Sequence, residues 1–98
     1  MAETSDFASI LSSKPKLSTL IKYHYLNEEW YFLGALLEVD SEELNKIEDK
    51  YSNDRMRMVK MFGVWLEKME NPTYRKLLKA LIDSDKRDIA QSICTGLG

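Results

Sequence analysis

The chain has 98 residues, 44% of them hydrophobic and 31% charged, a composition that indicates one folded domain around a single core and excludes a disordered chain. Its formal net charge of −2 argues against general nucleic-acid binding, which requires a concentrated basic surface. The longest apolar runs are too short to cross a bilayer, so no direct membrane insertion is expected.

The N-terminal part of the sequence divides into a tail and a first helix. Residues 1–15 are rich in serine and predict a flexible N-terminal tail, whereas residues 16–95 are expected to form the domain. Few prolines and glycines interrupt the chain, which favours helices over strands. A first helix is predicted over residues 16–26, because apolar side chains recur there with a helical period. Its apolar positions are Leu17, Leu20, Ile21 and Tyr25.

Side chains that can cap helix N-termini indicate where the next two helices begin. Asn27 is the expected cap of a second helix. Asp40, with Glu43 three residues later, forms an acidic variant of the capping box and predicts the start of a third. The inward positions of these two helices are Trp30, Leu33, Gly34, Leu37, Leu44, Ile47 and Tyr51.

A fourth helix is predicted from Asn53 or Asp54 to the Asn71-Pro72 pair, because the residue before a proline disfavours helical geometry. It contains the methionine-rich stretch MRMVKMFGVWLEKM, which suggests either an adaptable binding surface or a core helix. At 100° per residue, seven apolar side chains fill an arc of about 160° opposite four charged ones, which favours the core helix. Met56 and Val64 fall on the charged side. The seven are Val59, Met58, Met61, Phe62, Trp65, Leu66 and Met69, and the four are Arg57, Lys60, Glu67 and Lys68.

The C-terminal part predicts two further helices, capped by Thr73 and by Asp85 and ending at Gly96. Six short helices with tight connections indicate an all-α, antiparallel six-helix bundle. The inward positions of the last two are Tyr74, Leu77, Leu78, Leu81, Ile82, Ile89, Ala90 and Ile93. The expected core anchors of the bundle are Trp30, Leu33, Leu37, Ile47, Phe62, Trp65, Leu77, Leu81 and Ile93.

Three runs of residues together resemble a known family. The second and third helices read WYFLGALLEV and LNKIE, the fourth contains VWLEKM, and the C-terminal run is TYRKLLKALIDSDKRDIAQSI. Over residues 17–93 this pattern resembles the death domain, a six-helix bundle of the death-fold superfamily with Greek-key helix order. The matching C-terminal positions are Thr73, Leu77, Leu78, Ala80, Leu81, Arg87, Asp88, Ala90 and Ile93.

The sequence departs from the family pattern at two corners. Glu38 and Asp85 stand where the family commonly has glycine, and Ser84 replaces an apolar residue. These departures bear on local loop geometry and leave the fold assignment unchanged. The paired charges typical of death effector domains are absent from the sequence. The sequence does not distinguish a straight first helix from a kinked one of the CARD type.

Catalysis and metal binding are not expected. Cys94 and His24 are the only cysteine and histidine, so a nucleophile pair would lack an orienting third group, and a zinc site would lack ligands. The acidic run DSEELNKIED has neither the glycine nor the ligand spacing of a calcium loop. No cofactor is predicted. A single cysteine excludes an internal disulfide and favours the reducing cytoplasm.

Charge is distributed unevenly along the chain. Residues 27–49 hold eight acids and one base, whereas residues 55–98 hold nine bases and five acids. Distinct patches of opposite sign allow head-to-tail association, in which charge complementarity selects the partner. The acidic face is expected to use Glu42, Glu43 and Asp49, and the basic face of a neighbour Arg57, Lys60, Lys86 and Arg87.

The resemblance implies a non-catalytic module that binds other death domains or copies of itself in apoptotic or innate-immune signalling. Three alternatives remain from the residues alone. The bundle could be a monomeric structural or autoinhibitory domain that covers a segment of a larger protein, or, more weakly, a small helical enzyme or nucleic-acid binder. The charges could also serve only to keep its surface in water.

Overall fold

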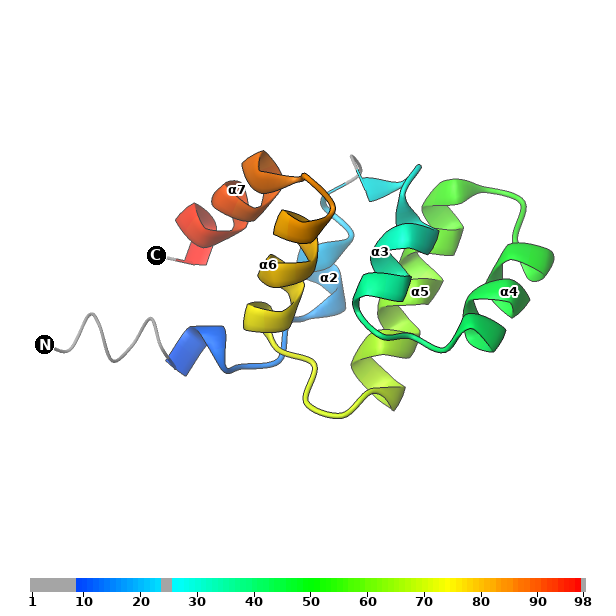
Figure 1. Ribbon diagram of the computed structural model, residues 1–98, viewed down its shortest axis with the longest axis horizontal. Coiled ribbons are helices and arrows are strands. Elements are labelled where there is room, and N and C mark those ends of the chain that lie inside the picture. The colour runs from blue at the N-terminus through cyan, green and yellow to red at the C-terminus, as the bar shows by residue number, and fades with distance from the viewer. Residues whose placement is uncertain (1–8, 24–25, 98) are drawn as a thin grey trace, which may run out of the picture.

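The computed structural model describes residues 9–23 and 26–97, and within these ranges the helices α2 to α7 and a further helical turn over residues 9–11 form a bundle without any strand (Figure 1). Figure 1 shows α3 to α6 running alternately in opposite directions, as expected for an antiparallel bundle. None of these helices is long and apolar enough to span a membrane. The helices are α2 (Leu17–Leu20), α3 (Trp30–Leu36), α4 (Ser41–Lys50), α5 (Asp54–Lys68), α6 (Tyr74–Asp83) and α7 (Arg87–Leu97).

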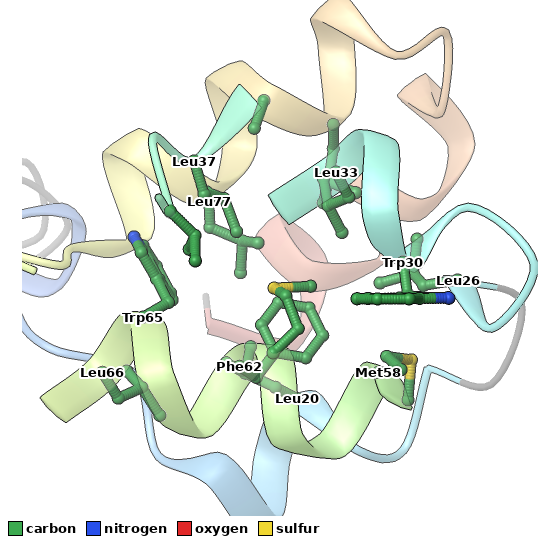
Figure 2. Close-up of a cluster of buried hydrophobic side chains, with 14 of the residues drawn as sticks. Leu20, Leu26, Trp30, Leu33, Leu37, Met58, Phe62, Trp65, Leu66 and Leu77 are labelled. Carbon is green, nitrogen blue, oxygen red and sulfur yellow. The ribbon is translucent and has the colours of Figure 1, made fainter. Parts of the chain in front are cut away.

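Helix α5 is the centre of the bundle and packs against α2, α3 and α4. Figure 2 shows its Phe62 and Trp65 side chains in the cluster that also holds Leu33 of α3 and Leu37, the residue that follows α3. The two aromatic rings meet edge to face, with their centroids 6.4 Å apart. The methionine-rich stretch is therefore mainly a core helix. The buried residues of α5 are Met58, Met61, Phe62, Trp65 and Leu66.

The expected core anchors all lie inside the bundle. Each of Trp30, Leu33, Leu37, Ile47, Phe62, Trp65, Leu77, Leu81 and Ile93 is at most 6% exposed. The prediction for Ile82 was wrong, because this side chain is 46% exposed. Its neighbours Leu78 and Leu81 face the core, and Ile82 lies beyond the edge of that apolar stripe. Tyr51 follows the end of α4 and is half-buried.

Two of the predicted N-caps are confirmed by their hydrogen bonds. The Asn53 side chain accepts from the Met56 amide at 3.1 Å, and the Thr73 hydroxyl accepts from the Lys76 amide at 3.3 Å. Asp40 occupies the N-cap position of α4, as expected, but its side chain makes no capping hydrogen bond. The capping box is therefore predicted at the correct place in the chain, but the hydrogen bond expected from the Asp40 side chain does not form.

The first helix is shorter than the predicted range 16–26. After Ile21 the amides of Lys22 and Tyr23 bond to carbonyls three residues back, so the regular helical ladder stops. The chain then turns and buries Leu26, which is 2% exposed. The chain therefore leaves the helix early and places Leu26 in the core. Tyr25, the last predicted apolar position, lies outside the described residues.

The predicted caps at Asn27 and Asp85 were wrong. Helix α3 begins three residues after Asn27, with Glu29 as its N-cap, and the side-chain oxygen Oδ1 of Asn27 is buried without a hydrogen-bond partner among the described residues. Asp85 belongs instead to the end of α6, where it has a φ of 64°. The chain reverses there before α7 begins.

Glu38 and Asp85 end their helices in the same way. Both have a left-handed backbone, with φ values of 68° and 64°. After α6, the Lys86 amide bonds to the Leu81 carbonyl at 2.7 Å, and the Asp85 amide bonds to Ile82. The residues after α3 repeat this pattern, which is the Schellman motif. The two corners therefore keep the geometry that favours glycine, although neither residue is a glycine.

Part of the predicted tail lies against the bundle. Ile10 and Leu11 are half-buried against the core, and Pro15 is buried. The Tyr74 amide, at the start of α6, bonds to the Ser13 carbonyl at 3.1 Å. Residues 9–15 are thus part of the packed structure, whereas residues 1–8 lie outside the described residues.

Candidate protein-interaction surfaces

The acidic face is built on α4, a helix whose exposed side carries most of its charge. Glu42 and Asp49 are exposed and lie near its two ends. Glu43 is half-buried and turned toward α5, where it forms an ion pair of 3.2 Å with Lys68. The structure therefore leaves Glu42 and Asp49 facing solvent and directs Glu43 inward.

Arg57 joins the end of α4 to the start of α5. Its guanidinium donates to the backbone carbonyls of Glu48 and Tyr51 and forms an ion pair of 3.2 Å with Asp54. Backbone carbonyls in the last turn of a helix have no partner within it, so Arg57 supplies the missing donors. This predicted partner-binding residue is thus used within its own fold.

The other predicted basic residues differ in how they are used. Lys86 forms an ion pair of 3.0 Å with Glu29, which ties the α6–α7 connection to the start of α3. Lys60 is exposed and lies over the Tyr51 ring, 5.5 Å from its centroid. Arg87 is exposed at the first position of α7. The predicted basic residues therefore do not form one patch.

Apart from Arg57, the predicted charges are at most weakly held by contacts within the described part of the bundle. Ion pairs at a protein surface contribute only about 0–1 kcal/mol, so Glu43 and Lys86 can exchange their partners at low cost. Glu42, Asp49 and Arg87 form no ion pair among the described residues. Opposite charges are thus presented on α4 and at the start of α7.

Sequence reasoning missed an uncharged surface on α3. The helix reads WYFLGAL and has no charged residue. Phe32 is 53% exposed and Ala35 is also exposed, while Tyr31 and Leu36 are half-buried. A helix that is apolar on all sides is normally buried, so the absence of charge over these seven residues was the available signal.

A shallow hollow of about 230 Å³ adjoins this surface between the ends of α3, α5 and α6. Its apolar lining includes Leu36 and Ala80, and its charged lining residues are Lys76, Lys79, Glu38, Glu70 and Asp83. The described residues contain no group of three side chains suited to a metal ion. Cys94 is half-buried in α7, and His24 lies outside the described residues.

This chain is a small helical bundle that exposes an acidic surface on α4 and an uncharged surface on α3. These features are typical of helical modules that bind other proteins. The Death domain family model matches residues 16–97, and the chain belongs to this family. It is accordingly a protein–protein interaction module of signalling. No curated protein and no solved structure gave a match.

Proposed function

We propose that this domain recruits other death domains, or copies of itself, into signalling assemblies of the apoptotic or innate-immune type in the cytoplasm, with no catalysis of its own. The recruiting contact joins the acidic side of α4, with Glu42 and Asp49, to a basic surface of the neighbouring domain. On this chain, the corresponding basic surface is at the α6–α7 connection, with Lys86 and Arg87.

The observation that supports this proposal most is the exposure of Glu42 and Asp49 on α4, where neither forms an ion pair with another of the described residues. Arg87 stands on a different element, so one copy presents acidic and basic surfaces in different places. Two surfaces of this kind make heterologous contacts, which extend as open assemblies when the rotation does not close. The single cysteine accords with a reducing compartment.

The test uses the double variant Glu42→Lys with Asp49→Lys. Binding is measured by co-elution and light scattering, with the chain itself and with a panel of purified death domains, at about 50 mM and 500 mM salt. We expect binding at low salt, weaker binding at high salt, and loss of binding in the variant. Circular dichroism should show unchanged helical content, because both side chains are exposed.

A matched control carries the same change of charge elsewhere, at the exposed residues Glu28 and Glu67. We expect Glu28→Lys with Glu67→Lys to bind like the wild type. Equal binding by the two double variants would refute the charged interface. A wild-type chain that stays monomeric and binds no member of the panel would favour the alternative, a domain that covers a segment of its own parent protein.

A further inference from the structure

We propose that Tyr51 is a phosphorylation site of this domain, at which a protein tyrosine kinase places a phosphoryl group on the hydroxyl and Lys50 and Lys60 hold the resulting phosphate. The modification lies at the corner between α4 and α5, and it does not depend on the charged contact proposed above.

Two lysines from different helices contact the Tyr51 ring. Lys50 ends α4 and Lys60 lies in α5, and their Nζ atoms are 5.7 Å and 5.5 Å from the ring centroid. Both lysines are exposed, and neither forms an ion pair with another of the described residues. Two positive charges therefore meet at an uncharged ring, where weak cation–π contacts hold them. A phosphate carries a charge of about −1.5 to −2 at pH 7 and three acceptor oxygens, so on this tyrosine it supplies an anion to both ammonium groups.

Four other charged residues lie near Tyr51 in the chain. Arg57 and Asp54 pair with each other at 3.2 Å, and Arg57 also donates to the carbonyls of Glu48 and Tyr51. Glu48 and Asp49 are exposed acids at the end of α4, and they repel a phosphate. Their carboxylates can turn into water, whereas the two ammonium groups already lie at the ring and can form charge-assisted hydrogen bonds. Attraction at contact distance therefore exceeds a repulsion that water and salt screen.

The place of Tyr51 in the fold suits an acceptor of a phosphoryl group. Tyr51 is the C-cap of α4 and has an extended backbone, with a φ of −118° and a ψ of 132°. Residues 51–53 connect α4 to α5, at the end of the bundle far from α7 (Figure 1). The ring is half-buried, but its hydroxyl forms no hydrogen bond with the described residues, whereas the Tyr31 hydroxyl donates to Asn45. A kinase must align the hydroxyl with the phosphate that it receives, which a connection allows more readily than a helix interior.

Acidic residues before Tyr51 indicate the class of kinase. Glu48 and Asp49 stand three and two positions before the tyrosine. Charge patterns of this kind select a kinase by complementarity, so the expected enzyme is a tyrosine kinase with a basic substrate groove. In the transfer, the Tyr51 oxygen attacks the terminal phosphorus of a nucleoside triphosphate, the bond from that phosphorus to the bridging oxygen breaks, and the nucleoside diphosphate leaves. The phenolic proton passes to the catalytic aspartate of the kinase.

The first experiment treats the whole chain with a panel of purified tyrosine kinases, ATP and magnesium, and locates the phosphate by mass spectrometry. We expect Tyr51 to be the main acceptor and most of the labelling to be lost in Tyr51→Phe, which keeps the ring. The matched control Tyr31→Phe removes the hydroxyl of another half-buried tyrosine and should be labelled like the wild type. Equal labelling of the wild type and Tyr51→Phe, or no labelling by any kinase of the panel, overturns the inference.

The second experiment tests whether the lysines hold the phosphate. Urea unfolding is compared for the chain with and without phosphotyrosine at position 51, which chemical synthesis of the 98 residues provides. We expect the phosphate to raise the midpoint of unfolding, and Lys60→Gln to remove most of that rise, because Lys60 joins the phosphate to α5. Lys46→Gln removes the same charge from an exposed position of α4 and should leave the rise unchanged. A phosphate that lowers the midpoint, or that shifts it equally in the wild type and in Lys60→Gln, overturns the inference.

Discussion

Two acidic residues hold backbone conformations that glycine adopts at least cost. Glu38 and Asp85 have φ values of 68° and 64° and close Schellman motifs after α3 and α6. A left-handed backbone costs a residue with a Cβ about 1–2 kcal/mol, and glycine avoids this cost. The gain in stability is smaller than that, because glycine loses more conformational entropy when the chain folds. We expect Glu38→Gly and Asp85→Gly each to raise the free energy of unfolding by about 0.5–1 kcal/mol, measured by urea denaturation.

The control for these substitutions is a glycine placed inside a helix. Lys46→Gly, in the middle of α4, should lower the free energy of unfolding by about 1 kcal/mol. If Glu38→Gly and Asp85→Gly were also destabilising, the left-handed geometry of the two corners would be wrong.

Two helical glycines have opposite surroundings. A Cβ on Gly34 would lie 2.7 Å from Leu44 Cδ2 and 2.9 Å from Met61 Cγ, and both side chains are buried. A Cβ on Gly63 would meet nothing within 4 Å. Gly34→Ala should therefore lower stability by about 1–2 kcal/mol, since overpacking exceeds the gain in helix propensity.

Gly63→Ala is the matched comparison, because it makes the same chemical change in the middle of α5. We expect it to raise stability by about 0.5–1 kcal/mol in the same urea experiment. A stabilising Gly34→Ala would show that α3 can move away from α4 and α5 without loss of packing.

At the scale of the helices, capping side chains differ in the bonds they make. Asn53 and Thr73 accept amide hydrogen bonds, whereas Asp40 makes none. Asn53→Ala and Thr73→Ala should each cost about 1 kcal/mol of stability. Asp40→Ala should cost only about 0.3–0.5 kcal/mol, the value of a negative charge near a helix N-terminus. Equal costs in thermal or urea unfolding would mean that Asp40 caps α4 in solution.

Helix positions could be predicted from the sequence where a cap and a long apolar period coincide. The start of α5 at Asn53 and that of α6 at Thr73 meet this condition, and the core side of α5 followed from its period. The end of the first helix could not be predicted, because it depends on the burial of Leu26 by the rest of the bundle. Asp85 has the chemistry of an N-cap, and only the hydrogen bonds of the preceding helix show that it ends α6 instead.

At the scale of the whole molecule, the sequence could assign charges to helices but could not tell how each is used. It grouped Arg57 with Arg87 because both are basic and lie on the predicted basic helices. Internal pairing depends on contacts between helices, such as the approach of Arg57 to the end of α4. The exposed surface of α3 was missed for the same reason, since apolar period alone does not show which side a neighbour covers.

The two arginines therefore give a last prediction, in which the same change of charge has different effects on fold and assembly. Arg57→Ala removes the donors to the Glu48 and Tyr51 carbonyls and should lower the free energy of unfolding by about 1–2 kcal/mol. Arg57→Lys should recover little of this loss, because one ammonium cannot reproduce the fork of donors. Arg87→Ala changes an exposed side chain, and its stability should stay within about 0.5 kcal/mol of the wild type.

Binding of other death domains should follow the opposite order. Arg87→Ala should weaken low-salt assembly in light scattering, whereas Arg57→Ala should retain it at temperatures where the variant is folded. A stable Arg57→Ala variant that fails to assemble would place Arg57 in the contact with the partner. The comparison thus separates charges that hold α4 and α5 together from charges that are available to a neighbouring domain.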